Sequence, residues 1–149
     1  MIDTVVIATD GSESVGRAVA VALDLADRFD AEVHALYVID QREVDSSPEA
    51  VREELRAALD ETGRDALATI EDQRDRNVTI EVREGRPADE IANYAREHDA
   101  DVVATGTRGR HGEHRFLLGS VAERVVRTCP VPVLTVRQIE GEGEPEATV

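Results

Sequence analysis

Residues 4–29, TVVIATDGSESVGRAVAVALDLADRF, place a strand pattern directly before a helix pattern. Thr4–Ala8 is a short apolar run, which is typical of a central strand in a parallel sheet. After Ser14, apolar residues recur three or four positions apart, which is the spacing of one helix face. These residues are Val15, Ala18, Val19, Ala22, Leu25, Ala26 and Phe29. The stretch therefore predicts a buried strand followed by an amphipathic helix.

The same alternation of strand and helix continues along the chain. Four further strands are predicted, at Glu32–Ile39, Val78–Arg83, Asp101–Thr105 and Val131–Arg137. The helix after the second strand would have Ser47 as N-cap and Pro48 as first residue, and would run to about Arg76 with Gly63 as a weak point. Two more helices begin at Pro87 and Ser120. This order requires a parallel sheet with helices on both faces, an α/β Rossmann-like three-layer sandwich.

The length and composition indicate one domain. The chain has 149 residues, of which 41% are hydrophobic and only 3% aromatic, so the core must consist mainly of Val, Leu, Ile and Ala. The last segment, Gln138–Val149, is acidic and interrupted by Gly and Pro. We predict a single domain over residues 1–137 and a disordered tail over residues 138–149.

The charge balance excludes several classes of protein. The formal net charge is −15 and the chain contains no lysine, which excludes a P-loop nucleotide hydrolase. The negative electrostatic field of such a chain repels nucleic-acid phosphates and anionic lipids. We therefore expect neither nucleic acid nor a membrane as partner. A single cysteine, Cys129, and the lack of a membrane-span or signal-peptide pattern predict a cytoplasmic protein. The acidic surface suits a salt-rich (halophilic) cytoplasm, although coding bias toward arginine would produce the same composition.

Ligands of doubly wound sheets bind where the strands end, which directs attention to segments 9–14, 38–46, 84–87 and 106–120. In the last of these, Gly106 and Gly109 let backbone N–H groups approach a ligand, and Gly119 precedes a helix start with Ser120 as N-cap. The segment is cationic, with one acid, Glu113, against three arginines, Arg108, Arg110 and Arg115. This pattern predicts a polyphosphate site. A glycine-rich loop whose arginines balance an acidic surface explains the spacing equally well.

Neither a dedicated metal site nor a catalytic group is predicted. His111 and His114 lie three positions apart, but in a glycine-containing loop with no third His or Cys nearby. We expect a divalent cation, Mg²⁺ or Mn²⁺, only on the phosphates of a bound nucleotide. Cys129 has no recognisable His–acid pair around it, so a nucleophile is not expected.

Gly106, Gly109, Gly119 and Ser120 match the pattern G-x2-G-x9-G-[ST], which resembles the nucleotide-binding signature of the universal stress protein family. Other stretches are similar to this family: the opening TVVIATDGSESVGRAVAVALDLA, HALYVID at 34–40, GRPADEIANYA at 85–95 and CPVPVLTVR at 129–137. The resemblance covers residues 2–137. It implies an adenine nucleotide alpha hydrolase-like fold with a five-stranded parallel sheet of order 3-2-1-4-5, and ATP as the ligand.

The resemblance also implies roles for single residues. Asp10, with Ala8 and Thr9 beside it, would contact the adenosine, and the Val38 backbone would contact the adenine. The phosphates would be held by the signature residues, the two that follow, and an arginine of the cationic segment: Gly106, Gly109, Gly119, Ser120, Val121, Ala122 and Arg108. The family's nucleotide-binding members often carry a hydroxyl at the place of Ala122, so one phosphate contact is missing. Without the resemblance, Asp10 is better interpreted as a turn former or helix cap.

The resemblance further implies a homodimer that pairs through the edge strand Val131–Val136, beyond Pro132. The predicted function is an ATP-binding regulatory module that senses nucleotide in a stress response and is read by another, unidentified protein. Two alternatives stay open. One is a slow nucleotide hydrolase or adenylyl-transferring enzyme of the same fold, and the other is an interaction protein of the family that binds no nucleotide.

Overall fold

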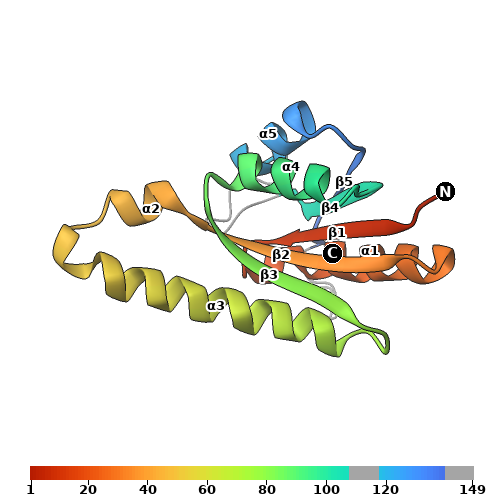
Figure 1. Cartoon of the computed structure of the whole chain (residues 1–149), viewed down its shortest axis with the longest axis horizontal. Helices are drawn as coiled ribbons and strands as arrows, with labels where there is room; N and C mark the ends of the chain where they lie inside the picture. Colours follow the sequence, from red (N-terminus) through yellow and green to blue (C-terminus); the bar gives the residue numbers. More distant parts are fainter. Residues whose placement is uncertain (108–117, 140–149) are drawn as a thin grey trace, which may run out of the picture.

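A computed structural model describes residues 1–107 and 118–139. Five parallel strands form one sheet in the order β3-β2-β1-β4-β5 (Figure 1). Their bounds are β1 (Thr4–Thr9), β2 (Glu32–Asp40), β3 (Val78–Gly85), β4 (Val102–Gly106) and β5 (Val133–Val136). The predicted α/β class and strand order are therefore confirmed.

Helices cover both faces of this sheet, which makes three layers (Figure 1). The helices α1 (Gly16–Phe29) and α3 (Arg52–Asp72) pack on one face, and α4 (Pro87–Glu97) and α5 (Ser120–Thr128) pack on the other. Three short elements complete the described part: the 3-10 turns η1 (Glu13–Val15) and η2 (Glu49–Val51), and the helix α2 (Gln41–Asp45). None of the helices within the described ranges is long and apolar enough to cross a bilayer.

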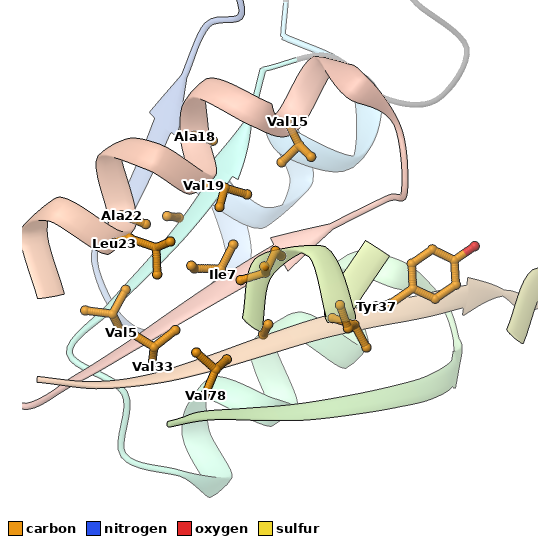
Figure 2. Packing of buried hydrophobic residues seen from close by; sticks show 14 of the residues in the cluster. Val5, Ile7, Val15, Ala18, Val19, Ala22, Leu23, Val33, Tyr37 and Val78 are labelled. Carbon is orange, nitrogen blue, oxygen red and sulfur yellow. The ribbon is translucent and has the colours of Figure 1, made fainter. Parts of the chain in front are cut away.

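Two hydrophobic clusters hold the layers together, because successive side chains of a strand point to opposite faces of the sheet. Val5 and Ile7 of β1 belong to the first cluster, with Val19 and Leu23 of α1 (Figure 2). The intervening Val6 belongs to the second cluster, with residues of β2, α4, β4 and α5 that include Leu36, Ile91, Tyr94, Val103 and Val125. Burial on both faces explains why β1 is a continuous apolar run.

The segment after β2 is not the single helix that the sequence predicts. The carboxylate of Asp40 caps α2 by accepting a hydrogen bond from the backbone N–H of Arg42 at 3.0 Å. Ser47 is not an N-cap, because its hydroxyl donates to the carbonyl of Glu43 at 3.1 Å and so closes the end of α2. The turn η2 then leads into α3, which begins only at Arg52.

Helix α3 also ends earlier than predicted, at Asp72. Beyond it, Arg74 donates to the carbonyl of Ala31 at 2.8 Å and pairs with Asp27 of α1 at 3.1 Å. The guanidinium is almost completely buried, so these two contacts anchor the chain after α3 to α1 and to the start of β2. This anchoring prevents the helix from continuing to Arg76.

Gly63 lies in the middle of α3 and is buried, and it is not a weak point of the helix. It faces the ring of Tyr37 on β2, and a Cβ atom at this position would stand only 2.6 Å from two ring carbons. The glycine therefore permits α3 to lie close against the sheet.

Strand β5 begins at Val133, two positions after the predicted start, and ends at Val136. Pro132 cannot donate to the ladder, but its carbonyl accepts a hydrogen bond from the N–H of Val103 at 2.9 Å. The side chain of Val131 packs against the second cluster instead. Within the described residues, strand β5 pairs with β4 alone and forms one edge of the sheet.

Candidate functional site

A cleft of about 350 Å³ lies between the first turns of α4 and α5, on the side where the strands end. Its described lining consists of Arg42, Arg86, Pro87, Ala88, Ser120, Val121, Glu123, Arg124 and Arg127. Four of these residues are arginines and one is an acid, whereas the whole chain has 32 acidic and 17 basic residues. The cleft is therefore a cationic site on an acidic protein, and it suits an anion.

Both helices present their amino-terminal ends at this cleft. Arg86 is the N-cap of α4 and Gly119 is the N-cap of α5, and neither makes a side-chain capping hydrogen bond. The first backbone N–H groups of both helices thus have no side-chain cap as acceptor. Such groups, with the positive end of the helix dipole, attract a phosphate.

Ser120 is not the N-cap of α5 but its first helical residue, because Gly119 takes the extended conformation (φ −65°, ψ 162°) and accepts the bond from Glu123. The N–H of Gly119 donates to the carbonyl of Thr107 at 2.6 Å. This bond joins the end of β4 at Gly106 to the start of α5. The two ends of the glycine signature therefore meet in space.

The central part of the signature segment lies outside the described residues. It holds the predicted ligands Arg108 and Gly109, together with Arg110, His111, Glu113, His114 and Arg115.

Asp10 forms a turn at the end of β1. Its Oδ1 accepts hydrogen bonds from the N–H of Ser12 at 2.9 Å and from the Ser12 hydroxyl at 2.6 Å. The next residue, Gly11, has a φ of +82°, a conformation that favours glycine. The turn-forming role that the sequence offers for Asp10 is thus present, and its contact with adenosine stays a prediction.

The predicted residues share one edge of the sheet but not one cavity. Ser120 and Val121 line the cleft, whereas Ala8, Thr9, Asp10, Val38 and Gly106 are outside its described lining. Ala8 is buried and Val38 packs on the second cluster. Ala122 is buried, so only its backbone is suited to a ligand.

The four arginines of the cleft are not among the site residues that the sequence predicts. Arg42 and Arg86 lie within the strand-end segments 38–46 and 84–87, so their position was the available signal. Arg124 and Arg127 follow Ser120 at helical spacing, which places all three on one side of α5. Only the packing of α4 beside α5 shows that this side faces a cleft.

The arginines differ in their ion pairs. Arg127 pairs with Glu123 at 3.0 Å, Arg42 with Asp40 at 3.4 Å, and Arg124 with Asp89 at 3.9 Å. Arg86 has no ion pair within the described ranges. Among the described residues, three acids thus pair with three of the four arginines, and the fourth, Arg86, is the N-cap residue of α4.

The sequence model of the universal stress protein family matches residues 1–137. The chain is 39% identical over 142 residues to Universal stress protein MJ0531 of Methanocaldococcus jannaschii, an alignment that covers 93% of this chain and 84% of that protein. It is 30% identical over 148 residues to Universal stress protein YxiE of Bacillus subtilis, covering 92% and 100%.

Solved structures show the same similarity. The structure of the hypothetical protein MJ0577 has a TM-score of 0.79 at 28% identity, over 94% of this chain and 99% of that one. A universal stress protein in complex with cAMP has a TM-score of 0.68 at 26% identity, over 93% and 98%. The fold, the matched length and the identity agree, and this chain belongs to the universal stress protein family.

Proposed function

We propose that this chain binds ATP at the carboxyl edge of its sheet and acts as a nucleotide-sensing regulatory module. The observation that carries this proposal is the cleft at the first turns of α4 and α5, which is rich in arginine on a chain of net charge −15. A relative of known structure binds the adenine nucleotide cAMP, which supports this class of ligand.

The phosphates are proposed to lie at the start of α5. The backbone N–H groups of Ser120, Val121 and Ala122 follow an N-cap without a side-chain acceptor, so they suit phosphate oxygens. The bond between Gly119 and Thr107 holds this helix end against β4. A divalent cation, Mg²⁺ or Mn²⁺, would ride on the phosphates and neutralise part of their charge.

The nucleoside is proposed to lie toward the ends of β1 and β2. In the sheet register Thr9 of β1 pairs with Tyr37 of β2, so Asp10 and Val38 both follow this pair at the same edge. A carboxylate beside a backbone carbonyl can accept hydrogen bonds from ribose hydroxyls and an adenine amine. This placement separates a nucleoside end from a phosphate end.

Regulation would follow from the thermodynamic coupling between ATP binding and the conformation of the protein. A ligand that binds one conformation more tightly shifts the population toward it, and a second protein can read that shift. We propose a homodimer as the unit, paired through β5, because this strand lies at the sheet edge and is bonded on one side only within the described residues.

The first test is to denature freshly purified protein and identify the released small molecules by mass spectrometry, followed by calorimetric titration with ATP and Mg²⁺ in molar salt. Released ATP, or saturable binding of ATP, is the expected result. No binding under these conditions would favour the interaction protein without nucleotide. Turnover of labelled ATP faster than about once per minute, slow on the scale of ordinary enzymes, would favour the hydrolase.

A further inference from the structure

We propose that the arginines between α4 and α5, chiefly Arg86 and Arg124, select the ligand by its number of phosphate groups. This inference rests on the proposed nucleotide site and names its preferred class, a nucleoside triphosphate over a monophosphate or a cyclic monophosphate. The side chains concerned are not part of the glycine signature, and they come from α4 and α5.

The cleft continues away from the signature along α5. Ser120 and Val121 line one part of it, Arg124 lies one helical turn further and Arg127 lies another turn beyond. With a rise of about 1.5 Å per residue, Arg124 stands about 6 Å along the helix axis from Ser120. A single phosphate held at the start of α5 leaves this part of the cleft empty, whereas a triphosphate chain can extend into it.

The charge of the cleft favours this extension. Arg86 is the N-cap residue of α4, lines the cleft and has no ion pair in the described part of the chain, so its guanidinium is available to a ligand. Arg124 is held by Asp89 only at 3.9 Å, a distance at which the pair is weak. A phosphate could replace this acid as the partner of Arg124 with bidentate geometry.

Arg127 and Arg42 contribute less. Arg127 is engaged by Glu123 at 3.0 Å, and the Nε of Arg42 lies 3.4 Å from Asp40 of the preceding strand end. Both still raise the positive potential of the cleft, and Glu123 opposes it as the one acid of the described lining. Arg86 has no ion pair among the described residues, and Arg124 has the longest of the three pairs. We therefore assign the selective contacts to these two arginines.

The test compares Arg86→Gln and Arg124→Gln with the matched control Arg96→Gln. Arg96 lies in the last turn of α4, is exposed, and donates to Asn93, outside the lining of the cleft. Calorimetric titration with ATP, ADP, AMP and cAMP measures the four affinities. The two cleft variants should lose about tenfold in ATP affinity, as for one charge-assisted hydrogen bond. Their AMP and cAMP affinities should stay within about twofold, as should all affinities of the control.

Equal losses for all four nucleotides, or no loss for ATP, would overturn the selection by phosphate number. Thermal melting of each variant tests whether the fold is intact. Inorganic tripolyphosphate separates this inference from the proposed function, because it has no nucleoside. If the native protein binds no nucleotide, the proposed function fails. In that case the cleft is still supported as an anion site if the native protein binds tripolyphosphate and Arg86→Gln binds it more weakly. The inference is overturned if the native protein does not bind tripolyphosphate, or if Arg86→Gln binds it equally well.

Discussion

The ring of Tyr37 on β2 lies directly beneath Gly63 of α3, so close that no side chain fits between them. A second glycine, Gly11 of the turn after β1, approaches the same ring, and a Cβ there would lie 3.4 Å from Cε1. The buried ring of Tyr37 therefore sets how closely α3 and the turn that carries Asp10 can approach the sheet. Helix α3 and the turn after β1 thus both rest against the ring of Tyr37.

Gly63→Ala is expected to destabilise the protein although alanine is the better helix former. The new Cβ would overlap the Tyr37 ring, and α3 would have to move away from the sheet. We expect a loss of about 3 kcal/mol in the free energy of unfolding, measured by urea denaturation. The control is Gly16→Ala in α1, where the added Cβ meets, among the residues that the structure describes, the Gln138 side chain alone, at 3.8 Å. A Gly63→Ala protein as stable as this control would show that α3 does not depend on the close approach.

Asp27→Asn is expected to weaken the anchor at the end of α3. Among the described residues, it leaves the buried guanidinium of Arg74 with the Ala31 carbonyl as its one full-strength acceptor. The expected cost is about 1.5 kcal/mol, since hydrogen bonds to charged groups are stronger than neutral ones. Asp24→Asn on the same helix is the control, because Asp24 and its partner Arg28 are 63% and 72% exposed. That change should alter stability by less than about 0.5 kcal/mol, and equal effects of the two substitutions would contradict the anchor.

Asp101 is expected to contribute to acid sensitivity. Its Oδ2 accepts hydrogen bonds from the N–H groups of Asp3 at 2.7 Å and Thr4 at 3.0 Å, and these bonds hold the pKa of the carboxyl below its ordinary value. A carboxyl with a lowered pKa stabilises the fold above its unfolded-state pKa, and this contribution is lost as the pH falls through the folded-state pKa.

Asp101→Asn should therefore lower the melting temperature at pH 7 and reduce the further decrease between pH 7 and pH 2. Asp65→Asn, an exposed position on α3, serves as the control and should follow the native protein at every pH. A native pH profile in Asp101→Asn would mean that the hydrogen bonds to the start of β1 contribute nothing to stability.

Two substitutions of Asp10 separate its role in forming the turn from the role of its charge. Asp10→Ala removes the acceptor of both Ser12 bonds, whereas Asp10→Asn keeps a side-chain oxygen for the turn and removes the charge. If Asp10 contacts the nucleoside, Asp10→Ala should weaken ATP binding by about tenfold and inorganic tripolyphosphate binding far less. Calorimetry with both ligands measures this difference. Equal losses in Asp10→Ala, with native affinity in Asp10→Asn, would mean that Asp10 serves only the turn.

Local patterns predicted most of the elements correctly. The strands β1, β2 and β4 are apolar runs, and α1 and α4 show their buried faces as periodic residues such as Ala18 and Ile91. Errors occurred at the ends of helices, where the hydrogen bonds of a single side chain decide the local structure. Serine favours the N-cap position, but the hydroxyl of Ser47 donates to the carbonyl of Glu43 instead. Helix α3 ends just before Arg74, whose side chain bonds to the carbonyl of Ala31.

The sequence by itself determined the parallel α/β fold and the family, because strand and helix periodicity and the glycine signature are properties of neighbouring residues. It also placed Gly106 and Gly119 at opposite ends of one segment. Only the tertiary structure decided that Arg42, Arg86 and Arg124 line one cleft and that Gly63 meets Tyr37. These residues lie far apart in the chain, and the packing of helices on the sheet brings them together.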